Sequence, residues 1–261
     1  MNRRNTETVH AVADNLFLEL GITDLQGLLK EGENIACGIE CYQLSHGEIF
    51  SLDVNREEID RYNFCKSLEA PYYVIASSPS SRKFQIFTIA DEEDKFELIE
   101  TLNETSFLAW WKQKQSFTQK KGMYEAQARI KDSYIDKLLF SNDLAWGVNI
   151  DGFKLDNAGN LLYIIEKRIT GRDVTQYDPN RFFHGTRNKS GDYPSWKILK
   201  DLADRLEIPL LLATFDKTSQ IVGLTRIMEV SARDGLSYSN EIYLFSNTQQ
   251  IQTEISRLIT I

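Results

Sequence analysis

The stretch LAWGVNIDGFKLDNAGNLLYIIEKRI, residues 144–169, decides the fold class because it predicts two strands joined by a turn. Apolar and polar residues alternate over its first half, which is the pattern of a half-buried strand. The segment DNAGN at 156–160 supplies turn residues, and the apolar run LLYII then begins a second strand. The predicted hairpin carries Asp151 on its first strand and Glu166 on its second.

The residues that follow predict a helix and more strands. YPSWKILKDLADRLEIP, residues 193–209, has apolar residues at helical spacing, with Ser195 or Asp192 as its N-cap. PLLLATFD, residues 209–216, is a short apolar run of the kind buried in a parallel sheet. Strands at 221–230 and 239–245 and a closing helix at 248–261 complete this half. We therefore expect an α/β fold with a mixed β-sheet flanked by helices.

The first half has an α/β pattern of its own. A helix is expected at 8–20, ended by Gly21, and a second helix at 57–68. The expected strands are NIACGIECYQL (34–44), EIFSLDVN (48–55), PYYVIASS (71–78) and KFQIFTIA (83–90). The polar segment SFTQKKG, 116–122, is the best boundary, so we expect a smaller N-terminal domain over 1–115 and a second domain over 122–261.

The two halves share an order of elements, which indicates a possible internal repeat. EIFSLDVN, a helix, LEAPYYVIASS and KFQIFTI parallel LLYIIEKR, a helix, LEIPLLLATF and IVGLTRI. A duplication would put Asp53-Val54-Asn55 in the place of Glu166-Lys167-Arg168, and that copy would suit binding or dimerisation better than cleavage. The alternative is that this order is common in α/β proteins.

Composition narrows the class of protein. The 261 residues are 42% hydrophobic, enough for a real core, and neither a signal peptide nor an apolar run of membrane-spanning length is evident, so we expect a cytoplasmic protein. Cys37, Cys41 and Cys65 lack metal-binding spacing and favour packed thiols. Motifs for nucleotide phosphates, a nucleophile elbow and HExxH are absent, which disfavours kinases, dinucleotide dehydrogenases and α/β-hydrolases.

Charge is distributed unevenly along the chain, whose formal net charge is −8. Residues 111–200 hold 16 Lys and Arg against 10 Asp and Glu, whereas the remainder holds 14 against 28. A basic middle segment fits a phosphate-binding surface. The alternative is a solvated face balanced by acidic neighbours.

The order helix, strand with Asp151, strand with Glu166-Lys167-Arg168, helix, strand resembles the catalytic core of the PD-(D/E)XK nuclease superfamily, which includes restriction endonucleases and Holliday-junction resolvases. The resemblance covers about residues 122–231 and begins with Gly122 and Glu125 at the head of a helix expected at 123–140. It implies a restriction-endonuclease-like core in the C-terminal half and metal-dependent hydrolysis of DNA phosphodiester bonds.

The residues themselves favour the same chemistry. Asp151 and Glu166 on adjacent antiparallel strands would face the same side and converge on one pocket, where they repel unless cations or protons neutralise them. Mg²⁺ or Mn²⁺ held by Asp151, Glu166 and the carbonyl of Lys167 would activate a water for attack on phosphorus. Glu125 would supply an outer ligand.

One position departs from the family pattern, because Arg168 stands where the family has lysine. Arginine stabilises transition-state charge but cannot act as a general base. Lys197 or Lys200 would replace the lysine only if the helix turned them toward the site. The alternatives are a catalytically inactive nuclease-like module that binds nucleic acid or protein, and a charged strand end held in ion pairs.

The long polar loop at 170–192 is the expected contact with DNA. Its cationic donors are Arg172, Arg181, His184, Arg187 and Lys189, and its stacking aromatics are Tyr177, Phe182 and Phe183. The alternative is a mobile surface loop. We expect a homodimer, because cutting both strands of DNA takes two sites.

Overall fold

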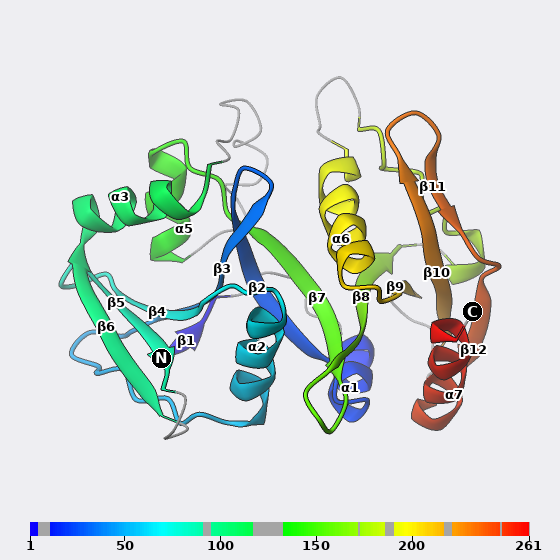
Figure 1. Ribbon diagram of the computed structural model, residues 1–261, viewed down its shortest axis with the longest axis horizontal. Coiled ribbons are helices and arrows are strands. Elements are labelled where there is room, and N and C mark those ends of the chain that lie inside the picture. The colour runs from blue at the N-terminus through cyan, green and yellow to red at the C-terminus, as the bar shows by residue number, and fades with distance from the viewer. Residues whose placement is uncertain are drawn as a thin grey trace. The chain divides into compact units, whose positions relative to one another are not determined.

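The computed structural model describes residues 1–4, 11–90, 95–116, 133–171, 173–185, 191–216, 221–245 and 247–260 (Figure 1). These residues confirm an α/β fold with a mixed β-sheet flanked by helices. The chain divides into two compact units, Met1–Thr6 with Leu25–Asn149 (unit 1) and Glu7–Asp24 with Ile150–Ile261 (unit 2). This division differs from a single boundary at 116–122, because unit 1 continues to Asn149 and the first helix belongs to unit 2. The helix Tyr134–Ser141, the described part of the helix expected at 123–140, therefore lies in unit 1 and not with the hairpin strands of unit 2.

Unit 1 holds the strand order β2-β3-β4-β5-β6, with β1 paired to β3. Neighbouring strands are antiparallel except β3 and β4, which are parallel and joined through α2. The strands are β1 (Asn2–Arg3), β2 (Thr23–Glu31), β3 (Asn34–Gln43), β4 (Tyr72–Ser78), β5 (Lys83–Ile89) and β6 (Phe96–Asn103). The helices are α2 (Arg56–Ser67), α3 (Glu104–Lys114) and α5 (Tyr134–Ser141).

The core of unit 1 lies between this sheet and helices α3 and α5, which lie together in Figure 1. It contains Leu29, Cys37, Ile39, Cys41, Ile75, Phe84, Phe107, Trp111, Ile135, Leu139 and Leu144. All three cysteines are free and buried, as the sequence predicts, and burial raises the pKa of Cys37 to about 12.

The expected strand EIFSLDVN is wrong. Residues 48–55 form no strand, and Ile49 is 80% exposed. The strand that pairs with β2 and β4 is β3, so the residues after it leave the sheet. Asn55 instead begins the next helix, because its side chain accepts a hydrogen bond from the backbone N–H of Glu58.

Unit 2 holds the order β7-β8-β9-β10-β11, with β12 paired to β10. The strands β8 and β9 are parallel and joined through α6, and the other neighbours are antiparallel. The strands are β7 (Val148–Leu155), β8 (Leu161–Thr170), β9 (Leu210–Asp216), β10 (Ile221–Ser231), β11 (Gly235–Tyr238) and β12 (Ile242–Phe245). The helices are α1 (Ala11–Glu19), a short 3₁₀ helix (Val174–Gln176), α6 (Tyr193–Arg205) and α7 (Thr248–Ile259).

The two faces of β8 pack against different helices. Tyr163 and Ile165 belong to a core that includes Phe17 of α1 and Ile251 of α7. Helix α6 packs on β8, β9 and β10, and its Trp196 is buried. Side chains two residues apart on β8 therefore share one face, and neighbours point to opposite faces.

The hairpin predicted at 144–169 is present. In its ladder, Gly152 pairs with Ile165, so Asp151 and Glu166 are opposite each other one step further along. A Cβ built at Gly152 would lie 2.5 Å from Ile22 and 2.8 Å from Ile165, so this crowded position requires glycine. Among the helices that the structure describes, none is long and apolar enough to cross a membrane.

Candidate functional site

Strand β8 separates its three charged side chains by alternation. The Nζ atom of Lys167 lies 3.0 Å from Oδ1 of Asp14 on α1 and 5.6 Å from the ring centre of Phe17. Arg168 points to the other face, where its guanidinium lies 5.4 Å from the ring centre of Trp196 on α6. The basic pair at 167–168 thus does not act as one cationic patch.

Arg168 is the centre of a carboxylate cluster in unit 2. Its Nη2 atom lies 3.0 Å from Oε1 of Glu166 and 3.4 Å from Oδ2 of Asp192. Oδ2 of Asp151 accepts a hydrogen bond of 2.9 Å from the backbone N–H of Lys167. Asp151 and Glu166 are both buried. Alternation and hairpin register therefore bring these side chains to one face of the sheet.

The carboxylates around Arg168 change the pKa of its guanidinium. Burial lowers the pKa of the guanidinium, but the carboxylates of Glu166, Asp192 and Asp151 outweigh burial and raise the pKa above its usual value. The hard carboxylate oxygens of Asp151 and Glu166 are the kind of ligand that suits Mg²⁺ or Mn²⁺.

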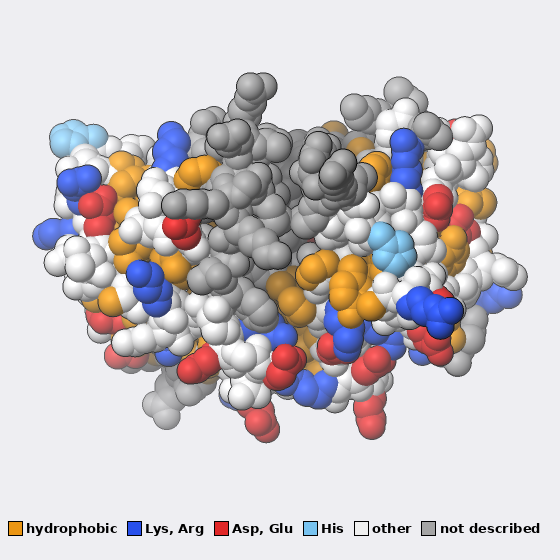
Figure 2. Space-filling view, turned by 90° about the horizontal axis from the view of Figure 1, so that it is seen from above, with side chains coloured by type: hydrophobic (Ala, Val, Ile, Leu, Met, Phe, Trp, Pro, Cys, Tyr) orange, Lys and Arg blue, Asp and Glu red, His pale blue; other side chains and the backbone are white. Residues whose placement is uncertain are grey.

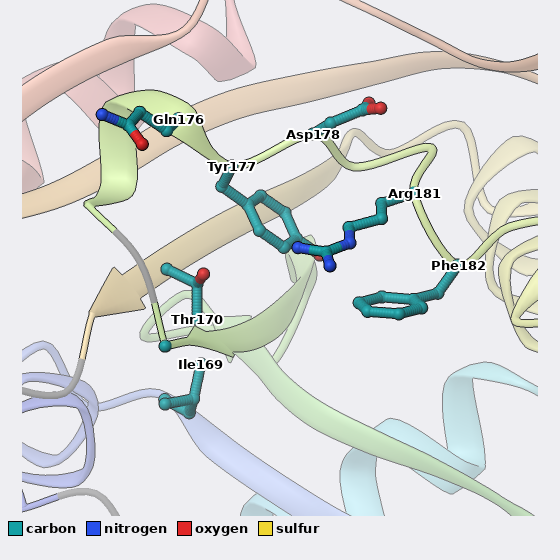
Figure 3. Close-up of a pocket in the computed structure, with 8 residues that line it drawn as sticks. Ile169, Thr170, Gln176, Tyr177, Asp178, Arg181 and Phe182 are labelled. Carbon is teal, nitrogen blue, oxygen red and sulfur yellow. The ribbon is translucent and has the colours of Figure 1, made fainter.

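A pocket of about 620 Å³ opens at the C-terminal end of β8 (Figure 3). Its lining comes from the strand end and the segment after it: Ile169, Thr170, Gly171, Gln176, Tyr177, Asp178, Arg181 and Phe182. Figure 3 shows the guanidinium of Arg181 directed toward the ring of Tyr177. Burial raises the pKa of Tyr177 to about 12, the nearby Arg168 opposes this shift, and the carboxylates of Asp192 and Glu166 add to it. Tyr177 therefore links the pocket to the carboxylate cluster.

The expected DNA-binding loop is described in part. The guanidinium of Arg181 lies 5.2 Å from the ring centre of Phe182, and both side chains are exposed. Phe183, expected to stack on bases, is instead fully buried and packs edge-on against Tyr193, with ring centres 5.4 Å apart. His184 is exposed. Gly122, Glu125, Arg172, Arg187 and Lys189 lie outside the described residues.

Several basic residues of the middle segment have acidic neighbours. On α6, Lys197 pairs with Asp201, and Lys200 pairs with Asp204. Both lysines therefore have an acidic partner on their own helix, one turn further along. Figure 2 shows Lys and Arg side chains interspersed with Asp and Glu on the face that it draws.

Asp192 and Tyr177 are members of this site that the sequence did not identify. Asp192 was expected at most to cap α6, but its side chain makes no capping hydrogen bond and contacts Arg168 instead. An acidic residue at a helix start is usually explained as a helix cap, so nothing in the sequence indicated that Asp192 contacts Arg168. Tyr177 was considered only as a stacking aromatic in the loop.

Within the described part of the chain, no group of three or more His, Cys, Asp or Glu side chains is arranged to hold a metal ion. The candidate site is therefore the pair Asp151 and Glu166, the cation Arg168 and the adjoining pocket. In comparisons with known proteins, no protein family, no curated protein and no solved structure matches this chain.

Proposed function

We propose that the protein is a metal-dependent endonuclease of the restriction or defence type that hydrolyses DNA phosphodiester bonds, with a restriction-endonuclease-like core in the C-terminal half. The observation that carries the proposal is the cluster in which Asp151 and Glu166, from adjacent strands, meet Arg168 on one face. Two carboxylates beside a fixed cation, next to a pocket, suit the charge changes of phosphoryl transfer.

In this proposal Asp151, Glu166 and the carbonyl of Lys167 would hold one Mg²⁺ or Mn²⁺ ion. When bound, the ion would lower the pKa of a water molecule and neutralise charge on the scissile phosphate. Arg168, held by Glu166 and Asp192, stays protonated and stabilises negative charge that develops on the phosphate oxygens.

The pocket at the end of β8 would bind the nucleotide beside the scissile bond. Arg181 is an exposed cation for a neighbouring phosphate, and Phe182 is 55% exposed and offers a face for base stacking. Arg172, Arg187 and Lys189 would extend these phosphate contacts. A homodimer would supply the two sites needed to cut both strands.

The second candidate is an inactive nuclease-like module that binds nucleic acid or protein. The specific observation in its favour is that Arg168 contacts Glu166 at 3.0 Å, so a permanent cation lies beside one proposed metal ligand. In this candidate the ion pair would replace the metal.

Incubation of the purified protein with supercoiled plasmid tests the two candidates. Nicked or linear DNA that forms with Mg²⁺ or Mn²⁺ and not with EDTA is expected for the nuclease. The matched control is the Asp151→Asn, Glu166→Gln double variant, which keeps the shape of both side chains and removes both charges. Plasmid that stays intact under all metal conditions, together with retained DNA binding, would select the second candidate.

A further inference from the structure

The hairpin of β2 and β3 in unit 1 repeats the hairpin of β7 and β8 in unit 2. Gly27 pairs with Ile39 in the first, and Gly152 pairs with Ile165 in the second. A Cβ at Gly27 would lie 2.9 Å from Ile39, and one at Gly152 would lie 2.8 Å from Ile165. In both hairpins the glycine makes room for the isoleucine across the ladder.

One step further along each ladder, Gln26 is opposite Glu40 as Asp151 is opposite Glu166. The side chains of Gln26 and Asp151 accept equivalent hydrogen bonds from the backbone. Oε1 of Gln26 accepts from the backbone N–H that follows Glu40, at 2.8 Å. Oδ2 of Asp151 accepts from the backbone N–H that follows Glu166, at 2.9 Å. Gln26 therefore corresponds to Asp151, and Glu40 to Glu166.

In each unit a helix leads from the hairpin to a parallel strand, and that strand pairs with the hairpin at the same position. The backbone N–H of Gly38 donates to the carbonyl of Pro71 at 2.9 Å, and that of Ile164 donates to the carbonyl of Pro209 at 3.1 Å. Two residues before each proline is a glutamate with a φ of +55°. These are the acidic-x-Pro segments that the sequence repeat identifies.

The structure corrects the alignment of that repeat. Asp53-Val54-Asn55 lies in no strand, and the segment at the place of Glu166-Lys167-Arg168 is Glu40-Cys41-Tyr42. The shift arises because the first strand of the repeat is β3 and not EIFSLDVN.

The two copies differ in charge. Glu40 is fully buried, and its carboxylate lies 2.7 Å from Nε of Arg3 and 3.5 Å from Nε of the buried Arg61. Arg61 stands ten residues before Pro71, and the residue ten before Pro209 in unit 2 is Leu199. In unit 1 an amide thus replaces one carboxylate, and two guanidinium groups contact the other. One of them, Arg61, also pairs with the buried Glu58 at 2.8 Å.

We infer that the chain is an internal duplication that keeps one carboxylate pair, Asp151 with Glu166, and has converted the other into a closed ion-pair cluster around Glu40. Each chain then carries one divalent-cation site, in unit 2, and none at Gln26 and Glu40. The cation site rests on the proposed function, whereas the duplication rests on the ladders and hydrogen bonds of each unit.

A stability comparison tests the closed cluster without any metal. Glu40→Gln removes the buried carboxylate that Arg3 and Arg61 share, while Arg61 keeps Glu58 and Glu57, and it is expected to lower Tm by about 5 °C or more. Glu166→Gln leaves the partly exposed Arg168 with Asp192 as its partner and relieves repulsion with Asp151, so it is expected to lower Tm by less than about 3 °C. Glu57→Gln, which touches Arg61 from a half-exposed position, is the control. Equal losses at Glu40 and Glu166 would overturn the assignment.

The equivalence of Gln26 and Asp151 has its own test, which does not depend on the folding of Glu40→Gln. Asp151→Gln restores an acceptor for the same backbone N–H and is expected to keep the wild-type Tm. Asp151→Leu removes the acceptor and is expected to lower Tm by several degrees. Equal Tm losses in both variants would contradict the equivalence.

Titration of the full chain with Mn²⁺, followed by electron paramagnetic resonance, counts the sites. One Mn²⁺ per chain that is lost in Asp151→Gln supports the inference, and two per chain overturns it. No bound Mn²⁺ would overturn the proposed function instead, and the Tm comparisons would still decide the duplication and its closed cluster.

Discussion

The guanidinium of Arg168 lies 3.0 Å from the carboxylate of Glu166, two residues before it on the same strand. The contact is possible because alternation puts both side chains on one face of β8, while Lys167 between them contacts Asp14 on the other. Arg168, which stands where the nuclease superfamily has lysine, thus contacts Glu166, which matches the pattern of that superfamily.

Substitution of Arg168 tests whether this residue is a catalytic cation or part of an inactive nuclease-like site. If the site is active, Arg168→Ala should lose about 10²-fold or more in metal-dependent cleavage, because it removes stabilisation of transition-state charge. Arg168→Lys should retain or raise activity, since it restores a compact cation on the same face. Plasmid cleavage rates at matched Mn²⁺ check both, with Lys197→Ala on α6 as the control. Equal rates in all three variants would exclude a catalytic role for Arg168.

Removal of either proposed ligand should abolish cleavage and leave the fold intact. Asp151→Ala and Glu166→Ala each remove a cation ligand and relieve repulsion between like charges. Thermal unfolding with and without Mn²⁺ gives an independent readout, because a ligand that binds only the folded state raises Tm. A Mn²⁺-induced shift that persists unchanged in the double variant would place the metal elsewhere and contradict the mechanism.

Neutralisation of the loop cations should weaken DNA binding. The triple variant Arg181→Ala, Arg187→Ala, Lys189→Ala is expected to reduce the slope of log affinity against log salt by about 0.9 per lost phosphate contact. The matched control neutralises three exposed arginines outside the loop: Arg82, Arg233 and Arg257. Fluorescence anisotropy at several salt concentrations measures the slope. The same slope in wild type and loop variant would assign these charges to solubility.

The pKa of Tyr177 predicts a stability loss at alkaline pH. Folding raises the pKa of Tyr177 from 10.0 to about 12. The contribution of protonated Tyr177 to the free energy of unfolding is therefore complete below pH 10 and is lost as pH rises through 12. Between these values the unfolded chain ionises first. Chemical denaturation of Tyr177→Phe should therefore show a smaller decline in the free energy of unfolding over this range than wild type. Identical declines would mean that Tyr177 titrates normally.

Gly152 should tolerate no side chain. In Gly152→Ala the new methyl group would meet Ile22 at 2.5 Å and Ile165 at 2.8 Å, so the free energy of unfolding is expected to fall by roughly 1–3 kcal/mol. Gly171→Ala is the control, because a Cβ there meets nothing within 4 Å, and its effect should stay within about 0.5 kcal/mol. Urea denaturation measures both, and equal losses would show that the crowding at Gly152 is relieved elsewhere.

The sequence by itself determined the hairpin at 144–169 and the faces of its side chains. Alternation follows from the covalent geometry of a strand, so Asp151 and Glu166 could be assigned to one side from local pattern alone. The helix at 193–205 and the buried strand after it were equally clear from apolar spacing.

Only the tertiary structure decided which strand of the first half belongs to the repeat. EIFSLDVN has the composition of a strand, but a strand needs ladder partners, and β3 is the one that pairs with β2 and β4. With β3 in that place, Glu40 and Gln26 become the counterparts of Glu166 and Asp151.

Tertiary structure also decided the surroundings of Arg168. Asp192 lies far along the chain from Glu166, and only the crossover through α6, which makes β9 parallel to β8, brings its carboxylate to the guanidinium. The membership of α1 in unit 2, with Asp14 against Lys167, has the same origin. Such contacts depend on how distant segments pack, and the local periodicity of a sequence records which face of an element is buried but not which partner buries it.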